Sequence, residues 1–337
     1  MSRSMQLCIG MKNIQFRIQF RIQLCIQLCI PFGFYHLRLD HLRQAAAFLF
    51  LFCAGGIAIA QDVADNVAGP YVPTPWVIVD EMLKLADITA ADTVYDLGSG
   101  DGRLVITSAK RYGARGVGIE LQDKLVELAR VEARTEGMDA RVRFKQGDLF
   151  EESYIDASVV TLYLLPRFVT RLVPKLRAEL KPGSRIVSHD YPLSPWPPDK
   201  VLTFEADEKE AITGSKRTTL YYYLVPASVA GRWHLSLPAA WFAEPLSLDL
   251  TQNLDGVEGK GSVGGDSFTV RDATVRGERV RFAIMTRGRY LILTGSIANG
   301  RMQGEVVWAG QRETWSASLQ SAQALSADLP STQPRKP

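Results

Sequence analysis

The feature that most constrains this chain is a glycine-rich turn between an apolar strand pattern and a helix pattern. The residues DTVYDLG (92–98) are typical of a buried strand, and the turn 98–102 leads into GRLVITSAKRYG (102–113). Glycines at Gly98 and Gly100 let the backbone turn sharply and approach a ligand closely. Ligands of open α/β sheets bind at the carboxyl ends of the strands, so this turn is a candidate binding site.

Strand and helix patterns alternate from residue 76 to about residue 190. A helix is predicted over 74–88, with Thr74 as its N-cap and Pro75 at its first helical position, where these residue types are favoured. Further strands are expected at 115–120, 141–148, 157–165 and 184–191, with helices at 123–137 and 166–180. This alternation predicts an α/β domain with a doubly wound, mostly parallel, Rossmann-like sheet over residues 68–226.

Acidic residues follow the next two predicted strands. Glu120 ends the strand 115–120, where a carboxylate can accept hydrogen bonds from both hydroxyls of a ribose. Asp148 follows the third strand, where its side chain or a nearby backbone amide can meet an adenine edge. The turn reads G-x-G-x-G with Asp101 inside it, whereas a dinucleotide favours G-x-G-x-x-G and no acid beside its pyrophosphate. The pattern favours S-adenosylmethionine over NAD as the cofactor.

Five motifs carry a family resemblance: PYVPTP, VYDLGSGDGR, GVGIE, LYLLP and KLRAELKPGSRIVSHDYPL. With them, residues 70–193 resemble the class I, seven-strand methyltransferases that use S-adenosylmethionine. The likeness is closest to the small mitochondrial and bacterial protein-lysine methyltransferases, and more distant to the non-SET histone lysine methyltransferase. It implies a seven-stranded sheet whose final strand, 216–225, is antiparallel, and a protein lysine as methyl acceptor.

The same resemblance implies roles for single residues around the cofactor. Tyr71 and Thr74 would close over its methionine end, Asp96, Gly98 and Asp101 would line its amino and carboxylate side, Glu120 would hold the ribose and Asp148 the adenine. Gly100 belongs to this cofactor-binding set because it allows close backbone approach.

The acceptor side is expected at the ends of the fourth and fifth strands. Tyr163 stands in a motif that lacks the Asn/Asp-Pro-Pro-Tyr of enzymes acting on planar amino groups, which argues against a nucleobase or glutamine acceptor. An aromatic lining of the acceptor channel is expected from Tyr71, Tyr163, Phe168 and Tyr191, although packing is the alternative role for Tyr163. His189, with Asp190 beside it, is a candidate general base; a structural role at the strand end is the alternative.

Composition excludes several other functions. A net charge of +3 over 337 residues gives no case for a nucleic-acid-binding surface. All four cysteines precede residue 54, so the folded part has no thiolate metal site or cysteine nucleophile, and no metal is expected. A small or lipid-like acceptor, and a non-catalytic envelope protein that keeps the fold for binding, remain alternatives to the lysine methyltransferase. Oligomeric state is not predicted.

The C-terminal third has a different pattern. Eight short segments alternate apolar and polar residues between turns such as LDG, GGD, TRG and ANG, which predicts an all-β barrel or sandwich over 230–320. Trp233, Trp308 and Trp315 are expected to fill its core. Residues 321–337, rich in Ser, Pro and Gln, are expected to form a disordered tail.

The N-terminal sixty residues carry a different signal. Residues 1–43 form a basic, low-complexity leader, and the uncharged apolar segment 44–61 ends in an A-x-A pattern typical of a signal peptide or membrane anchor. The pattern predicts an envelope or exported location, with a cytoplasmic or organellar one as the alternative. Export would place the catalytic part away from a cofactor that is made in the cytosol.

Overall fold

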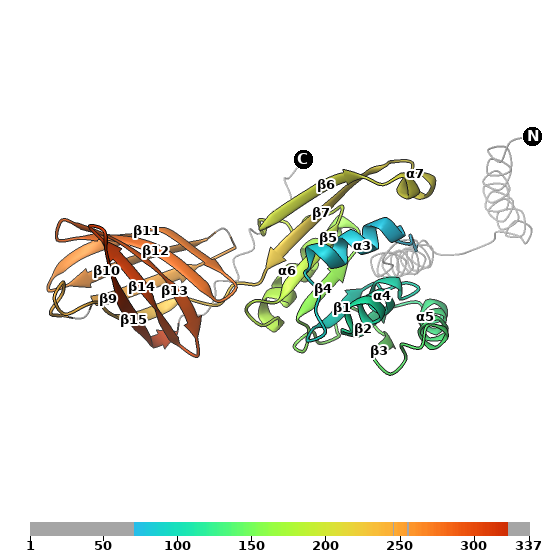
Figure 1. The fold of residues 1–337 in the computed structure, drawn as a ribbon, viewed down its shortest axis with the longest axis horizontal. Helices are drawn as coiled ribbons and strands as arrows, with labels where there is room; N and C mark the ends of the chain where they lie inside the picture. Colours follow the sequence, from blue (N-terminus) through green and yellow to red (C-terminus); the bar gives the residue numbers. More distant parts are fainter. Residues whose placement is uncertain (1–70, 245, 255, 323–337) are drawn as a thin grey trace, which may run out of the picture. The chain divides into compact units, whose positions relative to one another are not determined.

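The computed structural model describes residues 71–244, 246–254 and 256–322 (Figure 1). The predicted leader 1–43, the apolar segment 44–61 and residues 323–337 of the predicted tail lie outside the described residues. Within the described ranges, no helix has the length and apolar character needed to cross a membrane.

The first part of the described chain forms a seven-stranded sheet in the order β3–β2–β1–β4–β5–β7–β6. Its strands are β1 (Thr93–Leu97), β2 (Arg115–Glu120), β3 (Val142–Gln146), β4 (Val159–Leu162), β5 (Arg185–His189), β6 (Lys200–Glu205) and β7 (Arg217–Leu224). The first five are parallel, and β7 runs antiparallel to both β5 and β6. The Rossmann-like fold is confirmed, and its strand order reverses between β1 and β4, where such folds bind ligands.

Strand β6 was not predicted from the sequence. It lies at the edge of the sheet and, among the described strands, pairs only with β7. Alternate residues along it are exposed, so that its apolar pattern is weak. The short helix α7 (Asp207–Thr213) that joins it to β7 was also missed. Strand β6 extends the sheet beyond β7, and α7 connects these two strands.

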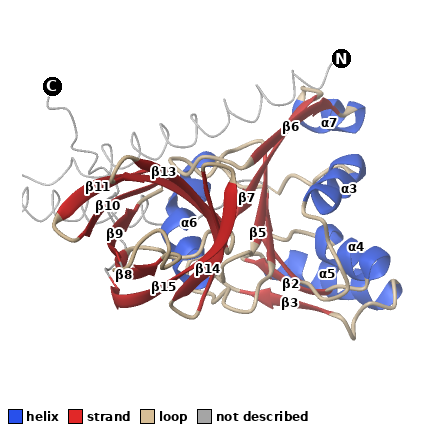
Figure 2. Ribbon diagram, turned by 60° about the vertical axis from the view of Figure 1, so that its left-hand side comes forward, coloured by secondary structure: helices blue, strands red, loops and turns tan. Residues whose placement is uncertain are grey.

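The other helices are α3 (Trp76–Leu85), α4 (Arg103–Tyr112), α5 (Asp123–Thr135) and α6 (Pro166–Glu179), shown in blue in Figure 2. The predicted start of the first helix was wrong by one residue. Pro75 is the N-cap of α3, with ψ 146°, and makes no side-chain cap. The backbone N–H of Trp76 instead donates to the Glu208 carboxylate of α7 at 3.0 Å, so a distant acid replaces the Thr74 cap.

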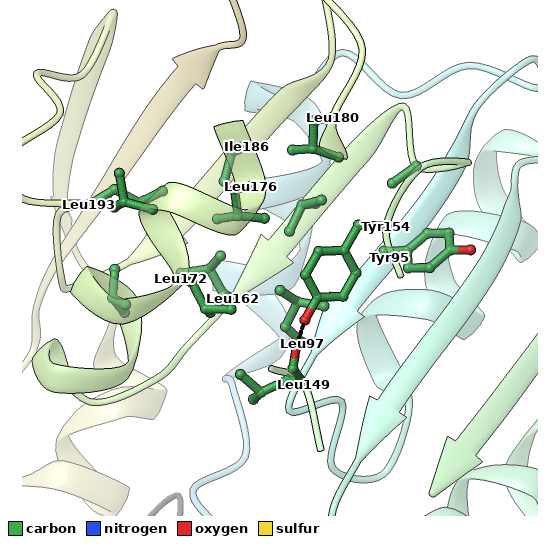
Figure 3. Packing of buried hydrophobic residues seen from close by; sticks show 14 of the residues in the cluster. Tyr95, Leu97, Leu149, Tyr154, Leu162, Leu172, Leu176, Leu180, Ile186 and Leu193 are labelled. Carbon is green, nitrogen blue, oxygen red and sulfur yellow. Dashed lines mark hydrogen bonds between the residues drawn. The ribbon is translucent and has the colours of Figure 1, made fainter. Parts of the chain in front are cut away.

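Helices α3, α4 and α5 pack on one face of the sheet, and α6 packs on the other. Close approach of α4 depends on glycine in β2: a Cβ at Gly116 would lie 2.3 Å from Val105 of α4. On the opposite face, Leu172 and Leu176 of α6 pack over Leu97 and Leu162 of the sheet (Figure 3). These two apolar layers fix the positions of the strand ends.

The C-terminal part forms a closed, antiparallel, eight-stranded barrel. Its strands are β8 (Gly231–Ser236), β9 (Leu246–Gln252), β10 (Val257–Val263), β11 (Asp266–Arg276), β12 (Arg279–Thr286), β13 (Arg289–Ala298), β14 (Arg301–Trp308) and β15 (Gln311–Ala322). Each strand pairs with its neighbour in sequence, and β15 closes the barrel on β8. All eight predicted strands are present. Trp233 and Trp315 are buried in the barrel core, whereas Trp308 is only partly buried against it.

The different burial of two tryptophans gives a stability prediction. Trp233→Ala should lower the free energy of unfolding of the barrel by about 3–5 kcal/mol, because it leaves a large cavity and an unpaired Val229 carbonyl that now accepts from the indole at 2.8 Å. Trp308→Ala should cost less than half of that. Denaturant unfolding followed by circular dichroism measures both. Equal losses would show that the barrel core is not centred on Trp233.

Candidate functional site

The carboxyl ends of five parallel strands bring the predicted site residues to one edge of the sheet. Across this edge they lie in the order Asp148 after β3, Glu120 at the end of β2, Asp96 and the glycine turn at β1, Tyr163 after β4, and His189 and Asp190 at β5. The first three strand ends form the predicted cofactor side, and the last two form the predicted acceptor side.

Glu120 is bonded directly to the glycine turn. Its carboxylate accepts the backbone N–H of Gly100 at 3.0 Å and that of Gln122 at 2.9 Å, and only 8% of the residue is exposed. The N–H groups of Gly98 and Ser99 donate to the Ile119 carbonyl at 2.8 and 3.0 Å. A carboxylate has about four acceptor positions, so Glu120 retains capacity for two further donors such as ribose hydroxyls.

A backbone hydrogen bond at the preceding residue places Asp148 near Glu120. The N–H of Gly147 donates to the Glu120 carbonyl at 3.0 Å, which aligns the ends of β2 and β3. One Asp148 oxygen accepts the N–H of Phe150 at 2.9 Å and orders the turn that follows. The structure therefore brings Asp148 next to Glu120, with one carboxylate oxygen used locally.

Asp96 is a buried acid at the end of β1. One of its oxygens accepts the Thr161 hydroxyl of β4 at 2.7 Å. Burial raises the pKa of Asp96 to about 7, and the negative charges of Asp101 and Glu120 act in the same direction against the Thr161 hydrogen bond. A cation bound near this carboxylate would favour its ionised form.

Tyr71 packs directly on the glycine turn. Gly100 has a φ of 54°, and a Cβ there would lie 2.4 Å from the Tyr71 ring. Burial and the neighbouring Asp101 carboxylate raise the pKa of Tyr71 to about 12, so its hydroxyl keeps its proton. Thr74 is buried and lies at the far end of the same short segment. The structure thus places Tyr71 on the turn, whereas Thr74 is joined to it through Arg103, whose Nη1 donates to the Thr74 carbonyl at 2.7 Å.

Asp101 is paired with a residue that sequence reasoning did not single out. Its two oxygens accept from the Arg103 guanidinium, with Nε–Oδ1 at 2.9 Å and Nη2–Oδ2 at 2.5 Å. Burial alone would raise the pKa of Asp101, but the hydrogen bonds and charge of Arg103 outweigh it and hold that pKa below its usual value. Arg103 follows the turn directly, and its adjacency to an acid was the signal available in the sequence.

Tyr163 and His189 stack at the ends of β4 and β5. Their ring centroids lie 3.9 Å apart at an interplanar angle of 31°. Burial raises the pKa of the Tyr163 phenol to about 12 and lowers that of the fully buried His189 imidazole to about 4. Within the described part of the chain, neither ring nitrogen of His189 has a hydrogen-bond partner. His189 is therefore neutral at pH 7 and able to accept or donate one hydrogen bond.

The Asp190 carboxylate is bound by residues of α7 and β7. It adopts a φ of 62°, and its carboxylate accepts the buried Lys209 ammonium at 2.6 Å and the Thr219 N–H at 3.2 Å. These bonds join the end of β5 to α7 and β7. The His189 Nε2 lies 3.5 Å from the same carboxylate. Lys209 was missed because nothing in the sequence relates α7 to β5.

Two of the predicted lining aromatics lie in the apolar core. Phe168 is buried in α6 with its ring 6.1 Å from that of Phe150, and Tyr191 is partly buried against the same cluster. Tyr163, by contrast, is half-buried at the edge. Over the described ranges, no group of three or more metal-ligating side chains is close enough to hold an ion.

The chain is similar to known methyltransferases. Residues 96–200 match the family model of the ANTKMT methyltransferase domain. A protein-lysine N-methyltransferase of Saccharolobus islandicus is 39% identical over 157 residues, which cover 46% of this chain and 93% of that protein. The mouse adenine nucleotide translocase lysine N-methyltransferase is 40% identical over 134 residues, covering 40% of this chain and 58% of that enzyme. The chain thus spans little more than half the length of the mouse relative.

A solved structure is also similar. The crystal structure of an RNA methyltransferase from Salinibacter ruber in complex with S-adenosyl-L-homocysteine is 46% identical, with a TM-score of 0.43, over 47% of this chain and 96% of that one.

Two buried groups should act on stability in opposite directions as pH changes. The pKa of Asp96 is about 7 in the folded chain, compared with its ordinary value of 3.8. The contribution of Asp96 to the free energy of unfolding therefore falls as the pH rises from 3.8 to about 7. Folded His189 stays neutral down to about pH 4 instead of its ordinary 6.5, so its contribution rises with pH between those values, by about 3 kcal/mol at most.

Single variants should separate the two effects. The measured quantity is the free energy of unfolding of the variant minus that of wild type. For Asp96→Asn this difference should increase by a few kcal/mol as the pH rises from 4 to 7. For His189→Gln it should decrease as the pH rises from 4 to 6.5. Denaturant unfolding at a series of pH values measures both differences. A difference curve for Asp96→Asn that is flat with pH would contradict the raised pKa.

Proposed function

Because the chain belongs to the family of S-adenosylmethionine-dependent protein-lysine N-methyltransferases, we propose that it methylates the ε-amino group of a lysine in a protein acceptor. The enzyme is a class I methyltransferase, and its cofactor is S-adenosylmethionine. The observation that carries the proposal is the bond from the Gly100 N–H to Glu120 beside Asp96 and Asp148, which forms an acidic cradle at the switch point of the sheet.

The residues present fit this cofactor. Glu120 keeps two acceptor positions for the ribose hydroxyls, and Asp148 lies next to it for the adenine. Asp96 is a buried carboxylate that gains from a nearby positive charge, which the amino and sulfonium groups carry. The ring of Tyr71 occupies the space of a Cβ at Gly100, so this end of the cradle has an aromatic cover. When bound, the cofactor supplies a methyl group on a sulfonium leaving group.

The acceptor side is proposed to lie at the Tyr163–His189 stack. An ammonium must lose its proton before it can attack, and an apolar, aromatic surrounding lowers its pKa. The Tyr163 ring face also attracts the positively charged methyl group of the cofactor. His189 is fully buried and stacked on the Tyr163 ring, so its proposed role is to hold that ring in place. Asp190 is engaged with Lys209 and Thr219 and acts by holding the strand end.

Cofactor binding tests the cradle. We expect Glu120→Gln to weaken S-adenosylmethionine binding by roughly tenfold to a hundredfold, because hydrogen bonds to a charged acceptor are worth about 1.5–3 kcal/mol. Glu132→Gln, on the exposed face of α5, is the matched control and should bind like wild type. Calorimetric titration measures all three. No heat from the wild-type chain would instead favour the non-catalytic binding protein.

Methyl incorporation tests the acceptor. With radiolabelled S-adenosylmethionine and a mixture of lysine-containing proteins, wild type should label lysine side chains, as located by mass spectrometry. Tyr163→Ala should lower the turnover number by at least about tenfold at saturating cofactor, because the lining that orients the amine is lost. Tyr290→Ala, exposed on the barrel, should leave it unchanged. Label in lipid, small molecules or RNA but not in protein would overturn the lysine acceptor.

A further inference from the structure

One guanidinium joins the glycine turn to the segment that lies over it. Arg103 is the first residue of α4 and forms the two-pronged pair with Asp101. Its Nη1 also donates to the Thr74 carbonyl at 2.7 Å, and its central carbon lies 4.9 Å from the centre of the Trp76 ring. Both members of the pair are less than one-fifth exposed, so water screens their attraction only partly.

The segment 71–74 depends on this contact. Within the described residues, the backbone of this segment makes one hydrogen bond, in which the Thr74 carbonyl accepts from the Arg103 guanidinium. Tyr71, at its start, lies on Gly100 and interacts with Asp101. At its end, the Trp76 N–H is held by Glu208. Arg103 thus fixes the middle of a short cover whose first side chain lies on the cradle.

The pairing also uses up the acceptor capacity of Asp101. Its oxygens receive the Arg103 Nε at 2.9 and 3.1 Å, Nη2 at 2.5 Å and the Arg103 backbone N–H at 3.2 Å. Few lone-pair positions remain for a cofactor ammonium. In contrast, one oxygen of Asp96 accepts the Thr161 hydroxyl, and the other has no hydrogen-bond partner within the described residues.

We propose that Arg103 is a positioning residue that clasps the segment Tyr71–Trp76 over the glycine turn, and that Asp101 serves this clasp instead of binding the cofactor directly. The proposal deepens the function proposed above and rests on it for the identity of the ligand. A cover held in this way must lift when the cofactor enters or leaves. The clasp therefore controls the dissociation rate of the cofactor, while Asp96 and Glu120 supply the contacts to it.

A double-mutant cycle distinguishes a clasp from a direct contact. Stopped-flow displacement should give dissociation rates for S-adenosylmethionine that are about tenfold faster in Arg103→Met and in Asp101→Asn, with association rates little changed. The cycle is made in a Tyr71→Phe background, because Asp101 also has a side-chain hydrogen bond with Tyr71 that does not involve Arg103. In that background the double variant should be no faster than the faster single one, because both substitutions remove the same interaction. If Asp101 binds the cofactor itself, its substitution will add a further loss in the Arg103→Met background, and the clasp is overturned.

Lys110→Met is the matched control, since Lys110 lies in the same helix and forms an exposed ion pair with Glu136 at the end of α5, away from the cover. Hydrogen exchange without ligand tests the clasp independently of cofactor binding. The amides of residues 71–79, other than Pro73 and Pro75, should exchange faster in Arg103→Met than in wild type or in Lys110→Met. Unchanged exchange there would overturn the clasp even in a chain that binds no cofactor. If wild type binds no S-adenosylmethionine but exchange does respond, the proposed function fails and the clasp stands.

The variant Arg103→Lys distinguishes loss of the clasp from a general loss of stability. Lysine can pair with Asp101 but does not reproduce the planar fork that also reaches the Thr74 carbonyl. We expect wild-type melting temperature with intermediate dissociation and exchange rates. A melting temperature that falls together with unchanged rates would show that Arg103 serves stability alone.

Discussion

A buried glutamate that accepts backbone hydrogen bonds organises the edge of the sheet on which the proposed chemistry depends. Glu120 ends β2 and holds the N–H of Gly100, so the turn after β1 cannot move independently of its neighbouring strand. No Lys or Arg of the described chain forms an ion pair with this carboxylate. Two backbone N–H groups stabilise its charge and leave other acceptor positions of its oxygens unused. The result is a negative site that is rigid and still has unused acceptors.

Three acids near one turn repel one another, and the structure resolves this in three different ways. Asp101 is neutralised by Arg103, Glu120 is stabilised by backbone N–H groups, and Asp96 keeps its proton to about pH 7. Such an arrangement suits a ligand that brings positive charge and hydroxyl donors, because binding then offsets the remaining repulsion. It is unsuited to the pyrophosphate of a dinucleotide, whose charge would oppose these carboxylates. The preference of the turn for S-adenosylmethionine follows from this electrostatic distinction.

The sequence predicted those features that a single strand or turn determines. Glu120 and Asp148 could be placed together because parallel strands end at one edge. The barrel strands followed from alternation with period two between clear turn residues. Contacts that depend on register or on distant elements could not be predicted. Thr161 meets Asp96 only because β4 pairs with β1 in one register, and Lys209 reaches Asp190 only through α7, whose edge strand gave no clear pattern.

The acceptor side presents a different physical problem, since a lysine must arrive without its proton. Burial lowers the pKa of His189 to about 4, so its imidazole is a weak general base at neutral pH. Asp190, the other acid there, is occupied by Lys209 and Thr219. In the proposed reaction, desolvation against the Tyr163 ring therefore favours the neutral amine, and His189 is stacked on that ring and holds it in place.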